Sequence, residues 1–148
     1  MSAPAQQGGS TLAAVMMLLV MGLMLLNAQH RQLDSALLLA SDQQRYLQAY
    51  NQAASALSWG MAQRWPQGGL SAGGWLCRQN VELSACVRQS ARAGMVLVRG
   101  EGALRSGEPL WLYQLSKTEG TGAEAGLIAE PGGWLDFCPE KKEADCAG

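Results

Sequence analysis

The feature that most constrains this chain is a long uncharged, apolar run near its N-terminus. From Leu12 to Leu26 the chain consists only of Leu, Ala, Val, Met and one Gly, and no Asp, Glu, Lys or Arg precedes Arg31. A helix needs about 20 such residues to cross the hydrocarbon core of a bilayer. The sequence therefore predicts a transmembrane helix over residues 10–29, followed by a segment that faces water.

Two other readings of the run remain open. A secretory signal peptide has a basic n-region and a small-x-small cleavage site, whereas this N-terminus has no Lys or Arg and Leu26 occupies a position where a small residue belongs. A plain uncleaved anchor needs only the apolar run. A buried core helix is disfavoured because it would normally be amphipathic, and this run is apolar on all sides.

The helix is expected to continue beyond the membrane as an amphipathic helix over residues 30–65. Steps of three and four residues place one set of side chains on a single stripe. The members of this predicted stripe are Leu33, Leu37, Ala40, Gln44, Leu47, Tyr50, Ala54, Leu57 and Met61. Pro66 and the pair Gly68-Gly69 are expected to end the helix. A stand-alone coiled coil is a weaker alternative because small and polar residues dilute the stripe.

The remaining residues, 66–148, predict a small antiparallel β domain. Candidate strands lie at 81–87, 95–100 and 110–115, where apolar and β-branched residues gather. The glycine pairs at 68–69, 73–74 and 132–133 are read as turns. One face of this sheet would pack on the stripe of the helix. The expected fold is α+β, with a long N-terminal helix packed on a small antiparallel sheet that carries disulfides.

All four cysteines lie in this domain, and they predict disulfides. They are Cys77, Cys86, Cys138 and Cys146. A domain of this size gains from covalent cross-links because its core is small. Three pairings are possible, and pairing of sequence neighbours would close two short loops. The spacing does not suit a zinc site. Disulfides would place the domain in an oxidising compartment such as the bacterial periplasm.

The composition offers no catalytic or nucleic-acid-binding constellation. The net charge is -1 and there is no basic patch. The single histidine, His30, has no nucleophile or metal ligands grouped with it in the sequence, so no enzyme activity, metal or cofactor is expected. The five tryptophans are expected to serve mainly in packing, with Trp75 or Trp134 as candidates for contacts with other proteins.

The apolar helix, its amphipathic extension and the cysteine-bearing domain together resemble type IV pilins and pseudopilins. The segment "GGSTLAAVMMLLVMGLMLL" is similar to the signal that a prepilin peptidase cuts after a glycine before it methylates the new N-terminus. The segments "ALSWGMAQRW" and "GGWLDFCP" are similar to segments of the enterobacterial YgdB-like prepilin-peptidase-dependent proteins, which are minor pilins. The resemblance covers most of the chain and is least clear from Pro66 to Gly133.

The resemblance implies a leader over residues 1–9 that is cut after Gly8 or Gly9, with Ser10 at or next to the new N-terminus. The leader lacks the Lys or Arg that is common in the family. Most pilins also carry Glu as the fifth mature residue, where its carboxylate meets the N-terminal ammonium of a neighbouring subunit. Here that position is Ala13 or Ala14. The same absence marks the K-type minor pseudopilins, which the family places at the filament tip.

The expected function is therefore that of a minor pilin-like subunit that initiates or caps a type IV pilus-like filament near its tip. Its expected partners are the prepilin peptidase, other minor pilins, the major pilin and the bacterial inner membrane, with a periplasmic C-terminal domain and no nucleic acid. The alternative function is that of a signal-anchored or bitopic envelope protein with a periplasmic interaction domain.

Overall fold

The computed structural model of the chain describes residues 7–70 and 73–147. Helix α1 spans Gln7–Ala62 and is followed by two short helices and six strands. In chain order these are β1 (Trp65–Pro66), α2 (Gln67–Leu70), β2 (Leu76–Asn80), β3 (Leu83–Gln89), β4 (Val96–Ala103), β5 (Pro109–Glu119), β6 (Glu124–Leu135) and α3 (Ala144–Ala147). The chain divides into two compact units, which meet within α1 between Gln43 and Gln44.

The first unit, called the helical unit below, runs up to Gln43. Its described residues are all helical. The large apolar side chains between Leu12 and Leu26 are exposed, and the most apolar 18-residue window has a mean hydropathy of 2.2 with none of its residues buried. Within the described part of the chain, α1 is the one helix that is long and apolar enough to cross a membrane. The expected single membrane span therefore has a suitable helix.

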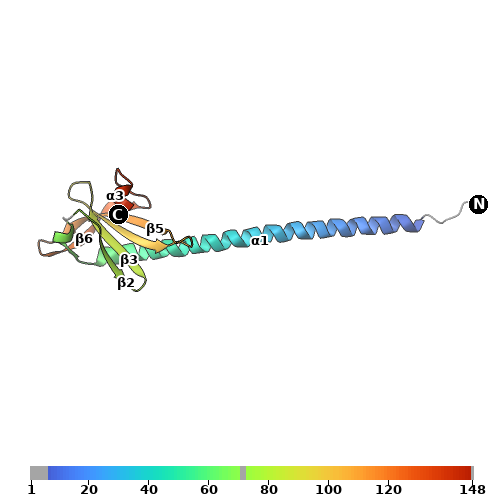
Figure 1. Cartoon of the computed structure of the whole chain (residues 1–148), viewed down its shortest axis with the longest axis horizontal. Coiled ribbons are helices and arrows are strands. Elements are labelled where there is room, and N and C mark those ends of the chain that lie inside the picture. Colours follow the sequence, from blue (N-terminus) through green and yellow to red (C-terminus); the bar gives the residue numbers. More distant parts are fainter. Residues whose placement is uncertain (1–6, 71–72, 148) are drawn as a thin grey trace, which may run out of the picture. The chain divides into compact units, whose positions relative to one another are not determined.

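The second unit, called the disulfide-bearing unit below, comprises Gln44–Gly148. Its strands form one sheet in the order β1-β6-β5-β4-β3-β2, and every neighbouring pair is antiparallel (Figure 1). The C-terminal part of α1 packs on one face of this sheet, where Ala53 and Leu57 join the apolar side chains of β3, β4 and β5. The expected α+β architecture is confirmed.

Glycines in β4 allow α1 to approach the sheet at backbone distance. A Cβ atom at Gly102 would lie only 2.0 Å from the carbonyl oxygen of Ala49. A Cβ atom at Gly100 would lie 2.3 Å from the carbonyl oxygen of Ala53. These distances are far below van der Waals contact, so only glycine fits at either position. The two glycines lie two residues apart and thus on the same face of the strand.

The opposite face of the sheet forms a second apolar cluster. Leu97, Tyr113 and Leu115 are buried there together with Cys146 from α3. Alternation along β4 assigns Val96 and Val98 to the α1 face and Leu97 to the α3 face. Both faces of this small sheet are therefore covered, which explains why nearly all residues of β4 are buried.

The predicted stripe of α1 is only partly correct. Leu33, Leu37 and Leu47 remain exposed, whereas Leu57 near the end of the helix is buried. The buried face is formed mainly by small residues, namely Ala49, Ala53 and Ala56. The prediction weighted large apolar side chains, but the contact with the glycines of β4 selects small ones.

The helix also ends earlier than expected, at Ala62 instead of Trp65. Trp65 and Pro66 form β1, which pairs with the start of β6. The fully buried indole of Trp65 donates a hydrogen bond from Nε1 to the carbonyl oxygen of Gly60 at 2.9 Å. This bond satisfies one of the carbonyl groups that a helix end leaves without an intrahelical partner.

The three predicted strands exist, with shifted ends, as β3, β4 and β5. Strands β1, β2 and β6 were not predicted. The pair Gly132-Gly133, read as a turn, lies inside β6, next to a register shift between β5 and β6. Gly132 has a φ of 70°, and Pro131 precedes it. The short strand β1 pairs with β6 only at Glu124 and Ala125, so this later stretch of β6 has no strand on its outer side. Proline and a left-handed glycine are tolerated in such an irregular edge, which explains why the segment resembles a turn.

Candidate functional site

The residues of the predicted cleavage site lie in the first turns of α1. Gly8, Gly9 and Ser10 are all helical, because α1 begins at Gln7. Among the described residues, no atom beyond the chain neighbours and the adjacent helix backbone lies within 4 Å of the place where a Cβ atom of Gly9 would be, and Ser10 is exposed. Residues 1–6 of the predicted leader lie outside the described residues.

Ala13 and Ala14 lie exposed on α1, in the middle of uncharged sequence. The nearest basic residue along the chain is Arg31, 17 or 18 residues away, which is more than four helical turns. A carboxylate introduced at either alanine would have no cationic side chain as a partner within its own segment. It could be neutralised by protonation, by a group from another molecule or, after a cut at Gly8 or Gly9, by the new N-terminal ammonium.

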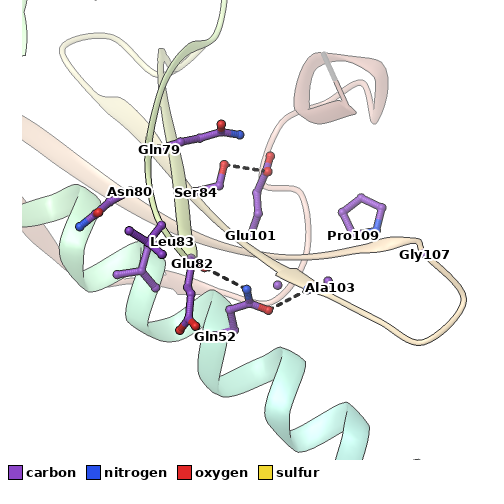
Figure 2. A pocket seen from close by; sticks show the side chains of 12 residues that line it. Gln52, Gln79, Asn80, Glu82, Leu83, Ser84, Glu101, Ala103, Gly107 and Pro109 are labelled. Atoms are coloured by element: carbon purple, nitrogen blue, oxygen red, sulfur yellow. Dashed lines mark hydrogen bonds between the residues drawn. The ribbon is translucent and has the colours of Figure 1, made fainter.

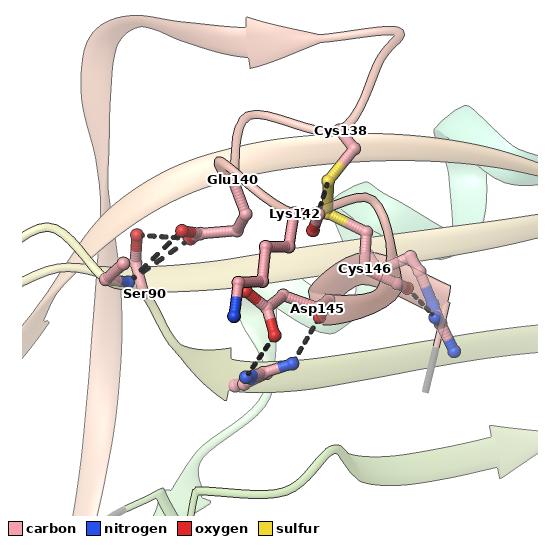
Figure 3. The surroundings of a disulfide bond; sticks show 9 residues. Ser90, Cys138, Glu140, Lys142, Asp145 and Cys146 are labelled. Atoms are coloured by element: carbon pink, nitrogen blue, oxygen red, sulfur yellow. Dashed lines mark hydrogen bonds and ion pairs between the residues drawn. A yellow bond between two sulfur atoms is a disulfide. The ribbon is translucent and has the colours of Figure 1, made fainter.

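The four cysteines form two disulfides between sequence neighbours, Cys77–Cys86 and Cys138–Cys146. Cys77 and Cys86 are opposite each other in the register of β2 and β3, so the first disulfide ties the edge strand to its neighbour. The second closes a short segment at the C-terminal end of the chain (Figure 3). This segment, residues 138–146, is called the C-terminal strap below.

The C-terminal strap is fastened to the sheet by side chains from β3, β4 and the residue after β3 (Figure 3). The hydroxyl of Ser90 donates a hydrogen bond to Oε1 of Glu140 at 2.6 Å. Arg88 donates to the carbonyl oxygen of Asp145, and its guanidinium also lies 3.5 Å from the carboxylate of that residue. Arg99 donates from Nη1 to the carbonyl oxygen of Cys146 at 2.5 Å. The strap is thus held by polar bonds as well as by its disulfide.

Arg99 is the most unusual residue of this face, because its charged side chain is only 5% exposed. Its guanidinium carbon lies 4.3 Å from the ring centroid of Trp75 and 4.6 Å from that of Trp111. Its Nη2 atom lies 2.9 Å from Oε1 of Glu101. Two aromatic faces and one carboxylate therefore stabilise a cation that would otherwise be costly to bury.

Trp75 and Trp134, the two candidates for contacts with other proteins, differ in their surroundings. Trp75 packs against the second apolar cluster and stacks on Arg99 within its own unit. Trp134 is 45% exposed and makes an edge contact with Tyr50, with ring centroids 6.3 Å apart. Of the two, Trp134 has the larger surface free for another molecule.

Tyr113 lies beside Arg99 and the C-terminal strap. Burial raises the pKa of its phenol, and the negative charges of Glu101 and Glu143 act in the same direction, whereas Arg99 opposes them. The phenol is thus kept neutral at physiological pH. It borders a hollow of about 290 Å³ that is also lined by Trp111, Phe137 and Cys138.

A larger hollow of about 520 Å³ lies between the β2–β3 turn and the end of β4 (Figure 2). The amide of Gln52 spans its base, because Nε2 donates to the carbonyl oxygen of Glu82 and Oε1 accepts from the backbone N–H of Ala103. Glu101 accepts a hydrogen bond from Ser84 at 3.0 Å. Within the described ranges 7–70 and 73–147, no group of three or more His, Cys, Asp or Glu side chains is placed to hold a metal ion.

Sequence reasoning missed the roles of Arg99, Glu101 and Gln52. The strand "VLVRGEGA" carried a usable signal, because an Arg and a Glu alternate with two glycines inside an otherwise apolar run. Alternation places the two charged residues on one face and the two glycines on the other.

One family model, described as "Protein of unknown function (DUF2509)", matches residues 17–146. The search of curated proteins and the search of solved structures find no match. The matched region begins inside the apolar run of α1 and continues to the last cysteine, so it includes the whole sheet and both disulfides. On this match, which covers most of its length, the chain belongs to the DUF2509 family.

Proposed function

We propose that this protein is a minor pilin-like subunit, held in the bacterial inner membrane until it joins a type IV pilus-like filament. The observation that carries the proposal is the continuity of α1. An uncharged, exposed apolar helix begins next to Gly8 and Gly9 and continues without interruption into a segment packed on a disulfide-bearing sheet. A cleaved signal peptide would not need such a continuation.

The disulfides support a periplasmic location for the disulfide-bearing unit. Structural disulfides persist in oxidising compartments, of which the bacterial periplasm is one. Helix α1 would supply the membrane span, with the disulfide-bearing unit on the periplasmic side. The proposed partners are the prepilin peptidase, other minor pilins and the major pilin.

Processing by a prepilin peptidase gives the first prediction. A protein with Gly8→Val and Gly9→Val together should remain in the membrane at full length, because β-branched side chains occupy the position where the peptidase requires a small residue. Intact mass and N-terminal peptide mapping of the membrane fraction report the length. A Gly68→Val variant is the matched control, because a Cβ there meets no atom of the described residues within 4 Å beyond its own helix and chain neighbours, and it should be shortened like the wild type.

Two outcomes would exclude a prepilin signal. If the double variant is shortened as the wild type is, the glycines do not define the cut. If the wild type is never shortened, the protein is better described as a signal-anchored or bitopic envelope protein with a periplasmic interaction domain.

We further propose a place near the filament tip, on the basis of the missing carboxylate at Ala13 or Ala14. A buried ion is unfavourable unless it is paired, so the Glu of other pilins aligns a subunit with the ammonium of its neighbour. A subunit that no other subunit follows at the tip gains nothing from such a group. The apolar side chain of alanine suits that position.

The tip proposal predicts that a restored carboxylate does not help assembly. Ala13→Glu or Ala14→Glu should insert and assemble no better than the wild type, because burying the unpaired charge costs roughly 2.5–3.5 kcal/mol near mid-membrane and less near the interface. The measurements are pilus number and co-purification with other minor pilins. Ala13→Gln and Ala14→Gln separate charge from size. Better assembly in a Glu variant than in its Gln control would contradict the tip position and leave the pilin assignment standing.

A further inference from the structure

The two disulfides differ in how openly they present a sulfur atom. Cys77 is exposed on β2, which is an edge strand, whereas its partner Cys86 is 1% exposed. In the C-terminal strap, Cys138 is half-buried and Cys146 is 1% exposed. Thiol–disulfide exchange requires access of a thiolate to one sulfur. Cys77 is therefore the most exposed of the four cysteine residues.

The buried sulfur of the same disulfide lies between two charged groups. Nη2 of Arg99 is 3.8 Å from Sγ of Cys86, and Oε1 of Glu101 is 3.9 Å from it. When the S–S bond breaks, the guanidinium stabilises negative charge on the departing sulfur and the carboxylate opposes it. At Cys146, the contact of Arg99 is with the carbonyl oxygen of the backbone.

Strand β2 can separate from the sheet with little loss of buried apolar contacts. None of its five residues is fully buried, and it pairs with β3 alone. Segments with few buried apolar contacts open at lower free energy than the rest of a fold. The Cys77–Cys86 disulfide is thus the covalent tie of an otherwise weakly held edge strand.

We propose that Cys77–Cys86 is a reversible thiol–disulfide exchange site for a periplasmic dithiol protein, while Cys138–Cys146 is structural. A thiolate of the dithiol attacks Sγ of Cys77, the Cys77–Cys86 bond breaks, and Cys86 leaves as a thiolate beside Arg99 before it takes up a proton. The second thiol of the dithiol then attacks the mixed disulfide and releases Cys77. The dithiol is oxidised to a disulfide, and this protein gains two electrons and two protons. The proposal does not depend on pilus assembly.

The test uses the folded full-length protein in detergent, with reduced glutathione as the probe. Aliquots are quenched with acid, alkylated and mapped as peptides. Glutathione should appear on Cys77, and Cys77–Cys86 should open roughly tenfold faster than Cys138–Cys146. Glutathione on Cys86, equal opening of both disulfides, faster opening of the strap, or no opening without denaturant would each overturn the proposal.

A pair of variants tests the environment of the leaving sulfur. Glu101→Gln removes the opposing charge and should speed the opening of Cys77–Cys86 roughly two- to tenfold. Glu108→Gln also removes one negative charge, but from an exposed position in the turn between β4 and β5, so it should not change the rate of opening of Cys77–Cys86. The strap disulfide is an internal control, because general loosening of the fold would accelerate both disulfides. An unchanged rate in Glu101→Gln, or equal acceleration of both disulfides, would contradict the assigned leaving group.

Discussion

Gly102→Ala should lower the free energy of unfolding of the disulfide-bearing unit by about 3 kcal/mol, the upper end for overpacking a core. The added methyl group would lie 2.0 Å from the carbonyl oxygen of Ala49 and 2.8 Å from its carbonyl carbon. Both are backbone atoms of α1, so no side chain can turn aside to make room. The helix must move away from β4, which also loosens the contacts of Ala53.

Denaturant unfolding of the detergent-solubilised protein, followed by tryptophan fluorescence, measures this effect. Gly74→Ala is the matched control, because no atom of the described residues beyond its chain neighbours lies within 4 Å of its Cβ position, and its φ is not positive. The control should stay within about 0.5 kcal/mol of the wild type. Equal stability of Gly102→Ala and Gly74→Ala would show that α1 does not approach β4 at backbone distance.

Loss of either disulfide should destabilise the same unit by about 2.5 kcal/mol, the value that loop-closure entropy gives for loops of this length. The sequence separations are 9 and 8 residues, so the entropic terms are nearly equal. Replacement by alanine adds a similar packing loss in both cases, because each disulfide has one buried cysteine, Cys86 or Cys146, that is 1% exposed. The helical unit in a membrane should keep its helix in both cases.

Paired replacements of both cysteines by alanine, one disulfide at a time, give these two numbers separately. Circular dichroism at a helix band monitors α1, and tryptophan fluorescence monitors the sheet. A stability unchanged by the loss of either pair would contradict the stabilising role given to that disulfide.

Much of the fold could be predicted because the strongest signals are local. The apolar run requires a helix of membrane-spanning length, and the absence of proline from Ser10 to Arg64 allows that helix to continue. Strands β3, β4 and β5 were found because their apolar and β-branched residues are contiguous. Disulfides were expected because all four cysteines lie in one small domain.

The features that escaped prediction depend on contacts between distant segments. The buried face of α1 uses alanines that face glycines in β4, and single-sequence periodicity gives such small residues little weight. Strand β6 contains Pro131 followed directly by Gly132 and Gly133, so the local preference there is for a turn, and pairing with β5 overrides that preference. Arg99 and Glu101 form an ion pair between residues that lie two apart on one face of β4. The burial of Arg99, however, depends on Trp111 from β5 and on Trp75 from just before β2.

The candidate processing site could be predicted only from the resemblance of the N-terminal segment to a prepilin signal. Within the described residues, Gly9 and Ser10 lie on an ordinary exposed helix, whose geometry does not reveal a recognition site. In the proposed function, a peptidase would recognise the segment itself. The physical signal in this chain is the position of two small residues immediately before an uncharged span.

The most direct test of the pilin-like assignment is the N-terminal mass of the membrane-bound protein, isolated from cells with and without a prepilin peptidase. The account predicts that only cells with the peptidase yield a protein that lacks residues 1–8 or 1–9 and carries a methyl group on its new N-terminus. The same measurement identifies which glycine precedes the cut. A protein of identical mass from both kinds of cell would contradict the assignment.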